Sequence, residues 1–142
     1  MRDQVTSIEQ SKRLIELGVP AQKASMVWIT GYFFGEPTSR AIMKESDDCI
    51  LSICRDRSML MGDNIVPAFT VADLLGIIKP LEIMKVELNP SLEKIGKEEW
   101  MFEFGEFTGE EICGFARNKS LVELLVGRIE WMVSNGYEPN LQ

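Results

Sequence analysis

The sequence predicts an α+β fold, in which a largely antiparallel sheet of about five strands is covered on one face by three helices. Two observations support this prediction: capping signatures at the start, middle and end of the chain, and period-two alternation of apolar residues between them. The chain has 142 residues, 45% of them hydrophobic, which is enough to bury one core without disulfides or metals. We therefore expect a single α+β domain over residues 1–142.

The first two helices are predicted from capping boxes, in which a hydroxyl and a carboxylate satisfy otherwise unpaired amides. Thr6 and Glu9 have this spacing, and so do Thr70 and Asp73. The first helix is expected to end at Gly18, because glycine readily adopts the left-handed conformation that terminates a helix. The second helix is shorter and ends where a proline follows.

The third helix is the longest and is expected to begin at Ser120 and to end at Asn135 and Gly136. Apolar side chains cover most of its circumference: Leu121, Val122, Leu124, Leu125, Val126, Ile129, Trp131, Met132 and Val133. Such a helix is buried in the core or against a second subunit. We favour the core, and homo-oligomerisation stays open. Gly127 is expected to permit close approach of a neighbouring backbone.

Alternation of apolar and polar residues predicts five strands. They are expected at residues 26–34, 49–54, 82–88, 99–107 and 111–116. Phe102 and Phe104 should lie on the buried face of their strand, with Glu103 on the other face. Residues 82–88 are expected to form one continuous strand, in which Met84 and Lys85 point to opposite sides.

Composition excludes several classes of function. The chain has no histidine, which removes imidazole bases and histidine-containing metal sites. Its three cysteines, Cys49, Cys54 and Cys113, are expected to be buried or half-buried free thiols rather than metal ligands or disulfides. No apolar segment approaches the ~20 residues of a membrane span, and no leader is expected. We therefore expect a cytoplasmic protein without a cofactor.

The charge of the chain is acidic and uneven. It carries 15 basic and 22 acidic residues, a net charge of −7. Residues 1–71 hold 8 basic and 9 acidic side chains, and residues 72–142 hold 7 and 13, so the net charges of the two halves are −1 and −6. Since no basic cluster is present, we expect neither nucleic acid nor a membrane surface as a partner.

One segment concentrates this negative charge. Six carboxylates lie within fourteen residues: Glu98, Glu99, Glu103, Glu106, Glu110 and Glu111. They are interpreted as a docking surface for a basic protein partner. Three alternatives stay open: the solvated face of an ordinary hairpin, a mimic of the nucleic-acid backbone, and paired carboxylates for catalysis or a hard cation.

A second candidate site lies in a loop that follows a buried strand. Arg55 and Arg57 flank Asp56, and Asp63 and Asn64 lie further along the same loop. Two guanidinium groups are suited to holding a phosphate or a carboxylate, as in a small enzyme or a ligand-binding domain. The alternative is a surface loop with local ion pairs, which contribute little to stability.

Three segments resemble a group of small uncharacterised proteins from prophages and other mobile elements of Bacteroides-type gut bacteria. They are residues 6–20, 65–78 and 120–137, which together cover about a third of the chain. The resemblance implies a genetic context rather than a mechanism, because the group has no known activity to carry over to this chain. Together with the acidic segment and the missing catalytic motifs, it leads us to expect a non-enzymatic accessory or interaction protein.

Overall fold

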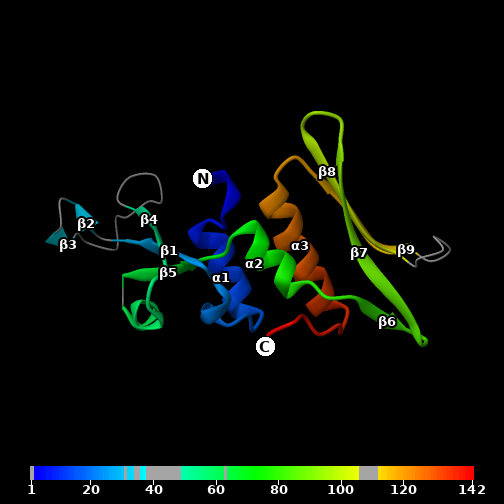
Figure 1. Cartoon of the computed structure of the whole chain (residues 1–142), viewed down its shortest axis with the longest axis horizontal. Helices are drawn as coiled ribbons and strands as arrows, with labels where there is room; N and C mark the ends of the chain where they lie inside the picture. The colour runs from blue at the N-terminus through cyan, green and yellow to red at the C-terminus, as the bar shows by residue number, and fades with distance from the viewer. Residues whose placement is uncertain (1, 31, 34–35, 38–48, 63, 106–111) are drawn as a thin grey trace. The chain divides into compact units, whose positions relative to one another are not determined.

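The computed structural model describes residues 2–30, 32–33, 36–37, 49–62, 64–105 and 112–142 (Figure 1). Within these ranges the chain is α+β, with three α-helices and antiparallel sheets of three and four strands. It divides into two compact units, Met1–Asp73 and Leu74–Gln142, each containing one of these sheets. The predicted fold class is therefore confirmed, whereas the single sheet of about five strands is replaced by separate sheets.

The first unit begins with helices and continues into short strands. Its elements are η1 (Arg2–Gln4), α1 (Ile8–Glu16), η2 (Ala21–Lys23), β1 (Met26–Ile29), β2 (Tyr32–Phe33), β3 (Glu36–Pro37), β4 (Ile50–Ile53), η4 (Arg57–Met61) and β5 (Ile65–Ala68). The three-stranded sheet has the order β4-β1-β5, and β2 pairs with β3 separately. The helix α2 (Val71–Ile77) follows β5.

The core of the first unit forms on one face of the three-stranded sheet. Trp28, in the central strand β1, lies opposite Leu51 of β4 and Val66 of β5. Its side chain is 1% exposed, and its indole N–H donates a 2.8 Å hydrogen bond to the carbonyl oxygen of Thr6. The buried apolar residues around it are Val5, Met26, Cys49 and Ala68. This indole therefore ties the strand to the segment that leads into α1.

The cap of α1 lies one residue later than the sequence predicts. Ser7, not Thr6, accepts a 3.1 Å hydrogen bond from the amide of Gln10, whose side chain accepts one of 2.9 Å from the Ser7 amide. Thr6 is fully buried instead. Its hydroxyl bonds to Ser11 at 2.7 Å and accepts from the amide of Phe69 at 2.9 Å. The Thr6 hydroxyl, which the local pattern assigns to the cap, is thus used for a long-range hydrogen bond with Phe69 instead.

Two other helix ends agree with the sequence prediction. At α2, the Thr70 hydroxyl accepts from the Asp73 amide at 3.1 Å, and the Asp73 carboxylate accepts from the Thr70 amide at 2.9 Å. The first helix is followed by Gly18, whose φ of 98° is left-handed. Both features depend only on neighbours in the chain, which is why the local sequence predicts them.

The predicted strand over residues 26–34 is broken in the structure. The strand β1 ends at Ile29, after which the amide and hydroxyl of Thr30 both donate to the carbonyl oxygen of Asn64, at 2.7 and 3.0 Å. The strand β5 was not predicted, because only four residues form it and one of them is Pro67. Gly31, within the predicted strand, lies outside the described residues.

The second unit is an antiparallel meander with one long helix. Its strands are β6 (Leu81–Ile83), β7 (Val86–Ile95), β8 (Glu99–Gly105) and β9 (Ile112–Asn118), in the order β6-β7-β8-β9. The helix α3 (Leu121–Ser134) packs against β8 and β9 (Figure 1). As predicted, it is the longest helix in the described part of the chain, it is capped by Ser120, and a left-handed Gly136 follows it.

The expected continuous strand over residues 82–88 is wrong. Ile83 pairs with Val86, so the chain reverses through a two-residue turn at Met84 and Lys85. Both turn residues have positive φ, 51° and 68°. The usual signature of such a turn is Asn-Gly, so nothing in the sequence marks it. Met84 consequently lies at a hairpin tip, where its side chain is 93% exposed.

Candidate functional site

The strand β8 separates the second unit into a buried and an exposed side. Phe102 and Phe104 are fully buried on the side that α3 covers. Glu99, Met101 and Glu103 alternate with them and are partly exposed. The alternation therefore points these side chains to the face opposite α3, as the sequence predicts for Glu103.

Neighbouring strands contribute to the same face. Met101 lies directly opposite Glu93 of β7 and Arg117 of β9, and Glu103 lies opposite Ser91 of β7. Directly opposed residues of antiparallel strands project to the same side of a sheet. We define the outer face as these residues together with Glu99 and Phe115: Ser91, Glu93, Glu99, Met101, Glu103, Phe115 and Arg117.

An irregularity in β9, the strand at one edge of this sheet, places Phe115 on this face opposite Glu103. Phe104 pairs with Cys113 and Phe102 with Ala116, so Gly114 and Phe115 together oppose the single residue Glu103. Gly114 has a φ of 64°, which is typical of a bulge that begins with a left-handed glycine. The side chain of Phe115 is 52% exposed, which is unusual for an aromatic residue within a sheet.

The other side of the bulge is closely packed. A Cβ atom on Gly114 would lie 2.8 Å from Cδ2 of Phe104 and 3.0 Å from Cζ3 of Trp131. Trp131, in α3, stacks on Phe104 with 5.8 Å between ring centroids and on Tyr137 with 5.6 Å. Only glycine fits between the strand and these rings, so the bulge is held against the helix.

A charged residue of α3 also binds the bulge. Nη1 of Arg128 donates a 2.9 Å hydrogen bond to the carbonyl oxygen of Gly114. Cζ of the same guanidinium lies 5.9 Å from the centroid of the Trp131 ring. Burial lowers the pKa of Arg128 from its ordinary value, and its Nε is buried without a hydrogen-bond partner among the described residues. The backbone beneath Phe115 is thus anchored from the helix side.

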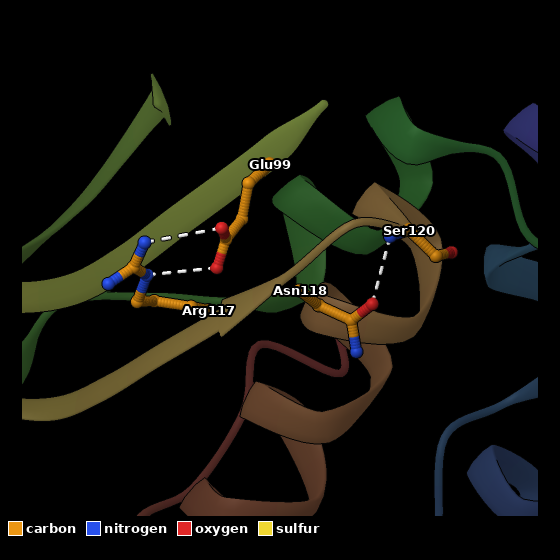
Figure 2. A network of polar contacts seen from close by, with 4 residues as sticks. All are labelled: Glu99, Arg117, Asn118 and Ser120. Atoms are coloured by element: carbon orange, nitrogen blue, oxygen red, sulfur yellow. Dashed lines mark hydrogen bonds and ion pairs between the residues drawn. The ribbon is translucent and has the colours of Figure 1, made fainter. Parts of the chain in front are cut away.

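One carboxylate of the outer face is already paired. Arg117 donates to Glu99 through Nε at 2.9 Å and through Nη2 at 3.2 Å (Figure 2). The two side chains are 49% and 34% exposed, so the pair is partly solvated and contributes only about 1 kcal/mol or less. Figure 2 also shows the next residue, Asn118, accepting a 2.8 Å hydrogen bond from the amide of Ser120 at the start of α3.

The predicted acidic segment is only partly brought together. Glu99 and Glu103 share the outer face, and Glu98 lies exposed in the turn between β7 and β8. The remaining carboxylates of the segment, Glu106, Glu110 and Glu111, lie outside the described residues. In contrast, Glu93 joins the face from a neighbouring strand, and the sequence analysis did not select it because strand order is not a local signal.

The sequence analysis also missed Phe115 and Arg117. The sequence does contain a signal for Phe115, because a glycine inside a strand pattern indicates a bulge. For Arg117 there was none, because its position across from Glu99 depends on the pairing of β8 with β9.

The structure describes only some of the side chains that the sequence predicts to hold an anion. Arg55 is exposed after β4, and Arg57 begins η4 with its side chain outside the described set. The Asp56 carboxylate accepts a 2.9 Å hydrogen bond from the amide of Ser58, and this bond lowers its pKa below the ordinary value. Asp63 lies outside the described residues, and the carbonyl oxygen of Asn64 accepts a hydrogen bond from the Thr30 hydroxyl. The described contacts of this loop are therefore those of a local turn.

The described residues offer little for binding a metal ion or a small ligand. No group of three cysteine, aspartate or glutamate side chains among them is arranged to hold a metal ion. One apolar pocket of about 200 Å³ is lined by Ile83, Met84, Val86, Leu88 and Cys113. Its volume lies below the range of about 300–1,000 Å³ that is typical of small-molecule sites.

None of the helices in the described part of the chain has the length and apolar character needed to cross a membrane.

Comparison with known proteins does not assign the chain to a family. No family model, no curated protein and no solved structure matches it. A function for the chain is therefore argued from the geometry described above.

Proposed function

We propose that this chain is a non-enzymatic interaction protein that binds a basic protein partner through the outer face of β7, β8 and β9. The observation that carries the proposal is the side chain of Phe115, which is 52% exposed and lies beside the carboxylates of this face. Apolar groups rimmed by polar residues mark protein-interaction sites, and here Phe115 lies near Met101 with Glu93, Glu103 and Arg117 around them.

The outer face has the composition of a protein-binding surface. Such interfaces place an aromatic anchor and apolar neighbours at the centre and polar groups around them. Here Met101 of β8 and Phe115 of the edge strand β9 supply the apolar groups, and Glu93 and Glu103 supply charged neighbours. The glycine bulge keeps the aromatic ring pre-positioned, which reduces the ordering that binding requires.

Charge favours a basic partner. Residues 72–142 carry 7 basic and 13 acidic side chains, a net charge of −6. A surface with this excess of carboxylates attracts positively charged proteins during diffusional encounter and repels acidic ones. The partner we propose presents an apolar side chain flanked by lysine or arginine. We further propose an accessory role in a mobile element, on the resemblance that residues 6–20, 65–78 and 120–137 suggest in the sequence.

The test uses two variants of the outer face and two matched controls. Phe115→Ala removes the anchor, and Glu93→Gln with Glu103→Gln removes two charges without changing side-chain size. Met84→Ala and Glu138→Gln make the same kinds of change at exposed positions elsewhere in the second unit. A partner captured from host lysate by the wild-type protein is purified, and its affinity for each variant is measured at several salt concentrations.

We expect Phe115→Ala to weaken binding by about tenfold or more, since an aromatic anchor typically contributes about 1–2 kcal/mol or more. The double Gln variant should weaken binding mainly at low salt, because screening already suppresses the charge contribution at high salt. Neither control should change the affinity. Equal binding of the partner by wild type and both outer-face variants would place its site elsewhere and refute the proposal.

A further inference from the structure

The strand β4 forms an edge of the three-stranded sheet in the first unit, far along the chain from the outer face. It pairs with β1 on one side, and no strand in the described part of the chain pairs with its other side. The amide of Cys54 donates to the carbonyl of Ser25 at 3.0 Å, so Cys54 directs its backbone groups toward β1. Since this direction alternates along an antiparallel strand, Leu51 and Ile53 direct theirs outward.

This edge lacks the features by which proteins prevent strand pairing. It contains no charged residue, proline or glycine over Ile50–Ile53, and its end residues Ile50 and Ile53 are 55% and 59% exposed. The opposite edge strand β5 is different, because it contains Pro67 and is contacted by α1 and η4. Among the described residues, β4 is therefore the edge of this sheet that is open to pairing.

The sequence of β4 is compatible with pairing to itself. An antiparallel twofold arrangement about Ser52 places Leu51 opposite Ile53 of the second copy, and Ile53 opposite its Leu51. Both side chains then lie on one face of the joined sheet, and both backbones present their outward groups to each other. Ile50 lies opposite Cys54 of the second copy. No charged side chain is opposed to another between these positions.

Charge favours a second copy over an acidic or basic partner at this edge. The chain as a whole has a net charge of −7, which would oppose self-association through its acidic half. Residues 1–71, which contain β4, hold 8 basic and 9 acidic side chains, a net charge of −1. The part of the chain that contains the open edge is therefore nearly neutral and adds little repulsion between two copies.

From these observations we infer that two copies of the chain associate through β4 in an antiparallel, twofold arrangement about Ser52. The two three-stranded sheets then form one continuous sheet. The carbonyl of Ile53, which accepts a long 3.5 Å contact from the Ser52 hydroxyl within the described part of the chain, receives the amide of Leu51 from the second copy. Because a single pair of short strands buries little surface, association should be weak and dependent on concentration.

The first test is sedimentation velocity of the full chain over a wide range of protein concentration. Wild type should shift from monomer toward dimer as the concentration rises. Ile53→Lys places a charge on the edge at a well-exposed position and should remain monomeric, while its circular dichroism spectrum stays that of the wild type. Met61→Lys introduces the same charge at a residue that is 85% exposed outside the strand, and it should dimerise like wild type.

The second test examines the register. Residues opposed at a non-hydrogen-bonded position of antiparallel strands have Cα atoms about 4.5 Å apart, within the range that a disulfide spans. Under mild oxidation, Ser52→Cys should therefore form a covalent dimer faster than Ser58→Cys, an exposed control in η4, and faster than wild type with its native thiols. A wild type that is monomeric at every concentration, an Ile53→Lys variant that dimerises normally, or equal crosslinking of the two cysteine variants would each overturn the inference.

Discussion

Arg128 of α3 donates a hydrogen bond of 2.9 Å from Nη1 to the carbonyl oxygen of Gly114 in β9. The bond joins the helix to the first of the two residues that form the bulge, and the Trp131 ring packs against the same glycine. A guanidinium gives up part of its hydration when it is buried, and here that burial lowers the pKa of Arg128. The arrangement holds the bulge in place and, with it, the exposed Phe115.

Gly114→Ala should destabilise the protein by about 3 kcal/mol, because it combines a left-handed φ with a steric overlap that two large rings cannot relieve. The new Cβ would lie 2.8 Å from Phe104 and 3.0 Å from Trp131. The free energy of unfolding in urea measures the effect.

Gly127→Ala is the matched control. Nothing lies within 4 Å of its added Cβ, so the close backbone approach expected from the sequence does not occur. Alanine in the middle of α3 should stabilise the protein by up to about 1 kcal/mol. If Gly114→Ala were as stable as wild type, the bulge would not be constrained as described.

The turn between β6 and β7 should become more stable when its two residues are replaced by ones that favour positive φ. Met84 and Lys85 both have positive φ, which non-glycine residues adopt only at a free-energy cost. Replacing the pair with Asn-Gly should raise the free energy of unfolding by about 1 kcal/mol, since this dipeptide is the preferred one for a two-residue hairpin. Thermal and urea unfolding measure the gain.

Met84→Ala alone separates turn geometry from the removal of an exposed apolar side chain. It should leave stability close to that of wild type, because its side chain is 93% exposed. A loss of stability in the Asn-Gly variant would contradict the turn seen in the structure.

Thr6→Val should destabilise the protein more than Ser7→Ala. The valine removes a hydroxyl that accepts from the buried Phe69 amide, and an unsatisfied buried amide costs about 1–3 kcal/mol. The alanine removes a helix cap that accepts from Gln10, a loss of about 1 kcal/mol. Urea unfolding of both variants gives the order, and the reverse order would support the cap that the sequence alone predicted at Thr6.

The parts of the fold that depend on neighbouring residues were predicted from the sequence. The capping box of Thr70 and Asp73, the cap at Ser120 and the alternation around Phe102 need only contacts within a turn or the period of a strand. At Met84 and Lys85 local reasoning failed, because pairing of the flanking strands there outweighs the weak turn preference of the residues themselves.

By itself, the sequence determined the α+β class, the three helices, the side of β8 on which Glu103 lies, and the excess of negative charge in residues 72–142. Tertiary structure alone decided that the strands divide into separate sheets, that Arg117 pairs with Glu99, and that Phe115 stands on the same face as the carboxylates. Helix caps and strand alternation arise from residues close together in the chain. Strand order, register and the bulge at Gly114 arise from residues distant in the chain, whose packing no local pattern encodes.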